Sequence, residues 1–298
     1  MPVGQPLFDP PPHAAVLERL VGWAAERDAV RAVLLTSTRA NPDAPTDPFS
    51  DYDVILAVTD VRRFFEDRSW LSDFGPVLVV YRDPIRPRGG GESFAYITQY
   101  ENGLKIDFSL WSVGVLRRIA KDGELPNDLD VGYAVLVDKD GLSDGLLEPT
   151  RRAYVPDPPS EDAYLTLVEE FLHEATYVAK HLWRDDLLPA KYNLDHAMKQ
   201  RDLRKMLSWL IETDGDWGVP VSAYGKGLKE RLPSATWEVL ERTYAGAGIE
   251  ENWNALFATV DLFREVAIEV GARLGFDYPR ELDGRVCRYL EGVRGLKP

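Results

Sequence analysis

The segment Asp51-Tyr52-Asp53-Val54-Ile55-Leu56-Ala57-Val58 decides the fold of the first half of this chain. Residues 54–58 are all apolar, which predicts a buried strand. Successive side chains on a strand point to opposite faces, so the single residue between Asp51 and Asp53 puts both carboxylates on one face. Unpaired charges at such a place are costly, and a bound Mg²⁺ would compensate them. The competing interpretation is structural, with Asp51 capping the strand entry and Asp53 solvated.

A second strand carries a third acid. Residues 104–110 alternate strictly between apolar and polar side chains, which predicts a strand with one face on the core. Asp107 lies on the polar face together with Lys105. An Asn-Gly pair at 102–103 supplies the positive φ angles of a tight hairpin with residues 93–100. The sequence therefore predicts Asp107 on the polar face of a hairpin strand.

Composition limits the class of protein. At 298 residues the chain is long enough for about two domains. The single cysteine, Cys287, excludes a disulfide framework and a CxxC zinc or redox site. We find no signal peptide and no long apolar run, so we expect a cytoplasmic protein that is not inserted in a membrane. A net charge of −14 disfavours a nucleic-acid partner and favours a cationic substrate, although solubility alone also explains it.

A change in the predicted secondary structure along the chain divides it into two domains. Residues 1–148 mix predicted strands and helices, with an irregular Gly- and Pro-rich stretch at 82–92. Four prolines mark residues 149–159 as a linker, and Ser160 begins a helix. Residues 160–298 are expected to be all-helical, so the predicted fold class is α+β. The long helices expected there span 163–183, 190–212, 234–245 and 252–274.

Short motifs in order along the chain resemble one enzyme family. They are Arg31-Ala32-Val33, Thr38-Arg39-Ala40-Asn41-Pro42, Asp51-Tyr52-Asp53, Val58-Thr59-Asp60, Ser69-Trp70-Leu71, Phe74-Gly75, Ile106-Asp107, Met206-Leu207-Ser208-Trp209 and Leu262-Phe263-Arg264-Glu265-Val266. With these motifs the chain resembles the streptomycin 6-adenylyltransferases, which are aminoglycoside nucleotidyltransferases. The resemblance covers nearly the whole chain.

That resemblance implies a fold and a reaction. The expected fold is an N-terminal mixed-sheet nucleotidyltransferase domain of the polymerase-beta type, followed by a C-terminal helical bundle. Asp51, Asp53 and Asp107 would bind Mg²⁺, with two ions about 4 Å apart, and ATP would be the co-substrate. Asp107 is the best-placed base for an acceptor hydroxyl that attacks the α-phosphorus and releases pyrophosphate.

The turn after the strand at 30–36 is expected to hold the triphosphate. Ser37, Thr38 and Arg39 would do so through backbone N–H groups and a hydroxyl. The family has Gly-Ser in this turn, whereas this chain has Ser37-Thr38. Thr38 keeps the hydroxyl, but the Cβ of Ser37 restricts positive φ and close approach to phosphate.

Further candidate residues concern the two substrates. Streptomycin carries guanidinium groups, which acidic side chains bind through charge-assisted hydrogen bonds. The candidate acceptor-binding acids are Glu92, Asp185, Asp186 and Asp195. Lys226 and Lys229 are candidates for the triphosphate, and exposed lysines without that role are the simpler interpretation.

Two other functions stay open from the sequence. The same fold could modify another cationic small molecule or tRNA, although the acidic balance disfavours tRNA. A catalytically silent ligand-binding homologue is the third possibility. The three retained acids argue against it, because a disused metal site gives no reason to keep costly charges.

Overall fold

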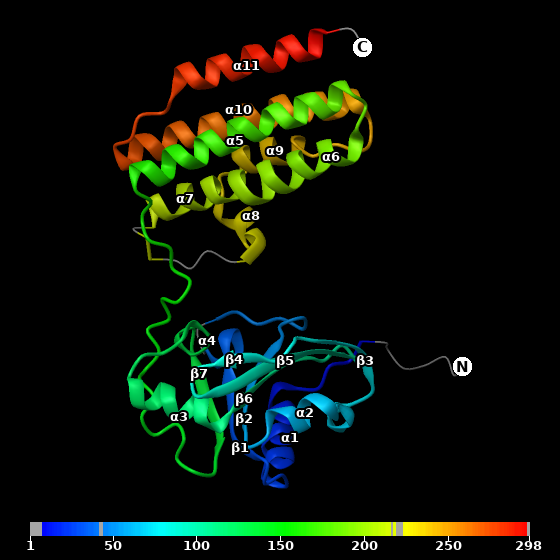
Figure 1. Ribbon diagram of the computed structural model, residues 1–298, viewed down its shortest axis with the longest axis vertical. Helices are drawn as coiled ribbons and strands as arrows, with labels where there is room; N and C mark the ends of the chain where they lie inside the picture. Colours follow the sequence, from blue (N-terminus) through cyan, green and yellow to red (C-terminus); the bar gives the residue numbers. More distant parts are fainter. Residues whose placement is uncertain (1–7, 42–43, 216, 219–222, 297–298) are drawn as a thin grey trace, which may run out of the picture. The chain divides into compact units, whose positions relative to one another are not determined.

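The structure is a computed structural model that describes residues 8–41, 44–215, 217–218 and 223–296. The chain divides into two compact units, Met1–Tyr154 and Val155–Pro298. The first unit contains the sheet and the second is helical, which confirms the α+β class (Figure 1). The boundary between the units falls inside the segment 149–159.

Seven strands of the described residues form one mixed sheet in the first unit. They are β1 Val30–Thr36, β2 Tyr52–Val58, β3 Val77–Arg82, β4 Arg86–Arg88, β5 Gly91–Tyr100, β6 Lys105–Ser112 and β7 Tyr133–Asp138. The order across the sheet is β3-β5-β6-β2-β1-β7, and β4 pairs with β5. Strands β2 and β6 run parallel, while the other pairs are antiparallel. The two acid-bearing strands are therefore direct neighbours.

Helices cover both faces of this sheet. They are α1 His13–Ala25, α2 Val61–Glu66, α3 Val113–Asp122 and α4 Asn127–Asp130, with 3₁₀ turns η1 Ser37–Ala40 and η2 Ser69–Phe74. Because side chains alternate along β2, Val54 and Leu56 enter a core shared with α1 and α2. Ile55 and Ala57 enter a second core shared with α3 and α4. The prediction of a buried strand at 54–58 is confirmed.

The predicted hairpin is also confirmed. Strands β5 and β6 pair antiparallel from Ser93↔Trp111 to Gln99↔Lys105. Gly103 at the turn has φ +91°, a left-handed conformation that favours glycine. Asp107 is thereby carried on β6 as the sequence predicts.

The expectation of an irregular stretch at 82–92 is wrong in part. Residues Arg86–Arg88 form β4, and Pro87 lies opposite Glu92 of β5. A proline is tolerated there because β4 is at the edge of the sheet, where no second neighbour requires its missing N–H. The following turn needs glycine, since Gly90 has φ +97° and a Cβ on it would come within 2.3 Å of the Gly114 carbonyl oxygen.

The second unit is built from helices. They are α5 Glu161–Trp183, α6 Leu187–Lys191, α7 Arg204–Asp214, α8 Leu228–Arg231, α9 Ser234–Arg242, α10 Ile249–Leu274 and α11 Arg280–Gly295, with a 3₁₀ turn η4 Ala223–Gly225. The helix expected at 190–212 is present but not uniform, because Tyr192–Leu203 between α6 and α7 is wound as a π-helix. No helix in the described ranges combines the length and apolarity needed to cross a membrane.

Contacts between α5 and α10 define the centre of the helical unit. The rings of Phe171 and Phe263 stack with centroids 3.7 Å apart. The buried Tyr164 hydroxyl donates to the Ala267 carbonyl at 2.7 Å, so its polar end is satisfied inside the core. Helix α5 begins at the predicted place, where the Ser160 hydroxyl accepts from the Ala163 N–H.

Candidate active site

Asp53 and Asp107 lie directly opposite each other on the parallel strands β2 and β6. The apolar residues that follow them fix this register, because Val54 and Phe108 are paired next and both enter the same core. Neighbouring strands are about 4.8 Å apart, so carboxylates at paired positions on one face are close. The acids share the face on which Trp111 packs against α3.

Lys105 lies among the acids. It precedes Asp107 by two residues on β6 and therefore projects from the same face. Its Nζ donates to Asp51 Oδ2 and, at 3.1 Å, to Asp107 Oδ2. The ammonium thus bridges carboxylates that come from two different parts of the chain.

Burial and mutual repulsion change the protonation of these acids. Burial, followed by the charges of Asp107 and Asp51, raises the pKa of Asp53 to about 6, against a lowering by Ser37 and Lys105. Burial also raises the pKa of Asp107, although Lys105 lowers it in part. Burial disfavours the ammonium of Lys105, but its bonds to Asp51 and Asp107 outweigh that effect and raise its pKa. The three carboxylates of Asp51, Asp53 and Asp107 therefore carry more negative charge than Lys105 neutralises.

The turn after β1 adopts an unusual backbone conformation. Ser37 has φ +63°, in the left-handed region that L-residues other than Asn and Asp rarely adopt. Its N–H donates to the Gly132 carbonyl at 3.1 Å. Burial raises the pKa of Asp53, and the Ser37 hydroxyl offsets that rise in part. Serine therefore takes the glycine-like conformation of this turn. Thr38 follows in the same 3₁₀ turn and is half-buried.

Arg39 anchors the segment that enters β2. Its guanidinium donates to the Ser50 and Asp51 carbonyls, with Nη2 to Ser50 O at 2.7 Å. It also stacks over the ring of Tyr52 at 4.0 Å. In this conformation Arg39 holds the backbone beside Asp51.

The geometry suits a small oxygen-coordinated cation. Asp107 Oδ1 is buried and has no hydrogen-bond partner among the described residues. Asp107 Oδ1 has no partner in the described part of the chain, and the pKa of the neighbouring Asp53 is raised. Both observations indicate that these carboxylates have too little positive charge around them. The oxygen ligands of Asp53 and Asp107 fit the preference of Mg²⁺. In the described ranges no three His, Cys, Asp or Glu side chains form a ready-made metal-binding group. Lys105 bonds to Asp51 Oδ2 and Asp107 Oδ2.

The remaining candidates lie elsewhere in the two units. Glu92, at the start of β5, forms an ion pair with Arg62. Asp185 and Asp186 are exposed in the link between α5 and α6, and Asp186 lies 3.6 Å from His181.

The two candidate lysines are in the second unit as well. Lys226 is exposed before α8. Lys229, in α8, is 3.6 Å from Glu241 and lies over the Trp237 ring. These contacts lie within the helical unit.

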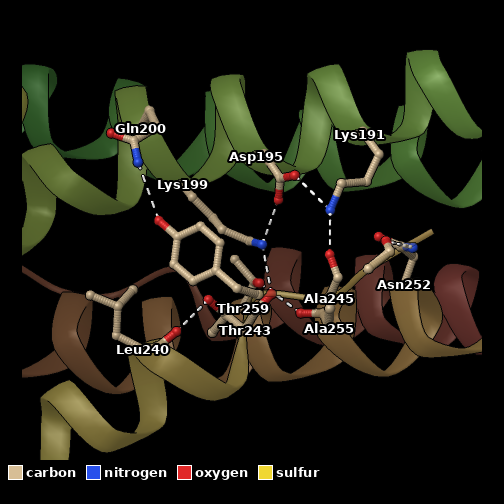
Figure 2. A network of polar contacts seen from close by, with 12 residues as sticks. Lys191, Asp195, Lys199, Gln200, Leu240, Thr243, Ala245, Asn252, Ala255 and Thr259 are labelled. Atoms are coloured by element: carbon tan, nitrogen blue, oxygen red, sulfur yellow. Dashed lines mark hydrogen bonds and ion pairs between the residues drawn. The ribbon is translucent and has the colours of Figure 1, made fainter. Parts of the chain in front are cut away.

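Asp195 is part of a polar network in the helical unit (Figure 2). Its two carboxylate oxygens accept from Lys191 at 2.7 Å and from Lys199 at 2.6 Å. Lys199 is almost fully buried, and it also donates to the Thr243 carbonyl at 2.6 Å. Lys191 donates to the Ala245 carbonyl at 2.8 Å. The network ties the π-helical segment to the chain between α9 and α10.

Lys105 is the residue at this site to which sequence reasoning gave no role. The signal was present, because Lys105 stands on the polar face of the Asp107 strand. Its contact with Asp51 depends on the pairing of β2 with β6 and could not be deduced from local alternation.

Acids on two adjacent parallel strands, beside a tight turn that follows the preceding strand, are the arrangement expected of a nucleotidyltransferase. The family model for streptomycin adenylyltransferase matches residues 13–293, and the chain belongs to this family. The sequence-based identification of the family and of the enzyme class is confirmed.

Individual relatives agree with this result. The chain is 31% identical to the aminoglycoside 6-adenylyltransferase of Bacillus subtilis (strain 168), over 93% of this chain and 96% of that one. It is 27% identical to the aminoglycoside 6-adenylyltransferase of Campylobacter jejuni, over 92% and 93% of the two chains. A crystal structure of an aminoglycoside 6-adenyltransferase from Bacillus subtilis shares 28% identity, with 94% and 98% coverage and a TM-score of 0.47.

Proposed function

We propose that this protein transfers AMP from ATP to a hydroxyl of an aminoglycoside in a Mg²⁺-dependent reaction. The acceptor we favour is streptomycin, at its 6-hydroxyl, and the modification would give antibiotic resistance. The observation that carries the proposal is the placement of Asp53 opposite Asp107 across β2 and β6. The names of the relatives support the choice of acceptor class.

The residues of the chain have distinct roles in this reaction. Asp51, Asp53 and Asp107 would hold Mg²⁺, which when bound neutralises the triphosphate and polarises the reacting phosphate. Asp107 accepts the proton of the acceptor hydroxyl as its oxygen attacks the α-phosphorus. The P–O bond to the β-phosphate breaks, and pyrophosphate leaves. A carboxylate beside bound Mg²⁺ has a lowered pKa, so the strength of Asp107 as a base would come from its position more than from its basicity.

The hydroxyls of the Ser37-Thr38 turn suit phosphate oxygens, whereas the Ser37 N–H already donates to the Gly132 carbonyl. The left-handed φ of Ser37 lets the chain turn sharply after β1, directly beside Asp53. Lys226 and Lys229 are exposed cations of the helical unit and are the candidates for binding the triphosphate. Arg39 would act indirectly, by holding the backbone at Asp51.

A cationic acceptor suits the acidic balance of the chain, whose net charge is −14. Asp185 and Asp186 are the exposed candidates for pairing with its guanidinium groups, whereas Glu92 would first have to exchange Arg62 for substrate. Asp195 is less suited, because Lys191 and Lys199 already occupy its oxygens.

Product analysis tests the function. The purified protein is incubated with Mg²⁺, each nucleoside triphosphate and a panel of aminoglycosides, and products are identified by mass with pyrophosphate measured in parallel. We expect AMP-modified streptomycin with ATP, and no product from Asp53→Asn. Nuclear magnetic resonance of the product then locates the modified hydroxyl.

The other outcomes distinguish the alternatives. Pyrophosphate release only with another cationic small molecule, or with tRNA, would replace the acceptor and keep the fold. Absence of both nucleotide binding and Mg²⁺ binding would identify a catalytically silent homologue and refute the proposal.

A further inference from the structure

The charges at the candidate active site are unequal before any ligand enters. Asp51, Asp53 and Asp107 contribute three carboxylates at one end of β2 and β6, and Lys105 contributes one ammonium among them. Arg39, the other nearby cation of this segment, is directed at the Ser50 and Asp51 carbonyls instead. Lys105 is therefore the side chain that offsets the repulsion between the two strands.

The ammonium holds the oxygens that a divalent cation would need. Lys105 Nζ bonds to Asp51 Oδ2 and Asp107 Oδ2, while Asp107 Oδ1 has no partner among the described residues. An ammonium and Mg²⁺ cannot occupy the same carboxylate lone pairs at once, since Mg²⁺ binds oxygen at about 2.1 Å. Asp51 Oδ1 and Asp107 Oδ1 carry no bond to Lys105, but Asp51 Oδ2 and Asp107 Oδ2 are not open to a cation until Lys105 leaves.

We propose that Lys105 is a built-in counter-cation that substitutes for the divalent ion in the metal-free protein and is displaced when the ion binds. This proposal rests on the proposed function, because it takes Asp51, Asp53 and Asp107 as the metal-binding acids. Lys105 then has two opposing effects: it stabilises the empty site and weakens metal binding. It is a positioning residue, since it acts through the carboxylates.

The position of Lys105 on the strand suits this exchange. Its side chain is 29% exposed, so the ammonium can move into solvent without crossing the core. The aliphatic stem of lysine is flexible, and three donors let the ammonium change partners without strict geometry. A buried, fully enclosed lysine such as Lys199 has no such route, because its side chain is 1% exposed.

Metal titration without nucleotide tests the exchange. Mn²⁺ is added to the metal-stripped full-length protein, and free Mn²⁺ is measured by electron paramagnetic resonance. We expect Lys105→Met to bind Mn²⁺ about fivefold more tightly than the unaltered protein, since an ion pair of about 1 kcal/mol no longer competes. Lys105→Arg, which keeps the charge, should stay within about threefold of the unaltered protein.

Thermal unfolding supplies a second measurement. In EDTA, Lys105→Met should unfold at a lower temperature than the unaltered protein, and saturating Mn²⁺ should restore most of that loss. A structural role alone predicts a loss that Mn²⁺ does not restore, and this outcome overturns the proposal. Unchanged or weaker Mn²⁺ binding by a folded Lys105→Met protein also overturns it.

A third measurement needs no variant. Amine acetylation of the unaltered protein, read by mass spectrometry at each lysine, should be faster at Lys105 with Mg²⁺ than with EDTA. Lys229, which is exposed in the helical unit, is the matched internal control and should not respond. An equal rate at Lys105 in the two conditions contradicts displacement.

Failure of this inference is distinguishable from failure of the proposed function. If Asp53→Asn and Asp107→Asn abolish Mn²⁺ binding while Lys105→Met leaves it unchanged, the metal site stands and the exchange is refuted. If neither aspartate variant affects Mn²⁺ binding, the metal site itself is refuted and the exchange falls with it.

Discussion

Asp53 and Asp107 face each other across the parallel strands β2 and β6, although more than fifty positions separate them in the sequence. The crossover through β3, β4 and β5 returns the chain beside β2 in parallel orientation. Two carboxylates at this spacing repel each other unless positive charge lies between them. That single pairing underlies both the proposed chemistry of the candidate site and the electrostatic repulsion within it.

Neutralising Asp107 should remove activity without unfolding the protein. We expect Asp107→Asn to lower the rate of nucleotidyl transfer at least about 100-fold, because both a metal ligand and the proposed base are lost. The matched control is Asp122→Asn, since Asp122 is exposed and pairs with Arg118 at the end of α3. Steady-state transfer rates and circular dichroism of both variants decide the matter, and an active Asp107→Asn would refute the role.

Stability should depend on pH through Asp53. Its pKa is about 6 in the folded protein against 3.8 as the ordinary value, so the folded state binds more protons between these values. The free energy of unfolding in EDTA should therefore fall as the pH rises from about 4 to about 6, by at most about 3 kcal/mol. Above pH 7 the ionisation of Asp53 should no longer change the free energy of unfolding with pH.

The control for this dependence is Asp53→Asn. Urea unfolding at several pH values should show a flatter profile for the variant, and greater stability than the unaltered protein at pH 7 in EDTA. An identical slope in both proteins would mean that Asp53 is not the titrating group.

Replacing Ser37 should separate backbone strain from the side-chain contact. Ser37→Gly removes the strain of φ +63° and should stabilise the protein by up to about 1 kcal/mol, measured by urea unfolding. Ser37→Ala keeps the strain but loses the hydroxyl that favours the ionised Asp53 carboxylate, so it should destabilise. A loss of stability in Ser37→Gly as large as that in Ser37→Ala would show that the hydroxyl outweighs the strain.

The network around Asp195 predicts an order of stabilities in the helical unit. Asp195→Asn leaves the buried Lys199 without its counter-charge and should cost about 3 kcal/mol. Lys199→Met should cost less, about 1–3 kcal/mol, because Asp195 keeps its ion pair with Lys191. The cost that remains comes from the Thr243 carbonyl, which loses one hydrogen-bond donor. Lys191→Met should cost least, since its side chain is 25% exposed. Urea unfolding of the three variants measures the order, and a reversed order of the first two contradicts it.

Most strands and helices of the first unit could be predicted from the sequence, because they are marked by patterns among neighbouring residues. Alternation along 104–110 and the Asn-Gly turn at 102–103 predicted the hairpin strand that carries Asp107. Residues 86–88 were predicted to be irregular but form a strand. From the sequence alone, a proline in an edge strand cannot be distinguished from a proline in a loop.

The ion-pair partners of charged side chains could not be predicted from the sequence. Glu92 and Asp195 were both candidates for a cationic substrate. The structure pairs Glu92 with Arg62, and Asp195 with Lys191 and Lys199. Lysines at i−4 and i+4 do indicate a helical ion pair, but the burial of Lys199 comes from packing between distant segments.

The sequence by itself determined the family, the two kinds of secondary structure in the two halves, and the face of each strand on which the acids stand. It did so because strand and helix periodicity are properties of neighbouring residues. Only the tertiary structure decided that Asp53 meets Asp107, that Lys105 bridges Asp51 and Asp107, and that Ser37 takes a left-handed φ. Those facts depend on strand pairing and side-chain reach between segments far apart in the chain, which local periodicity does not encode.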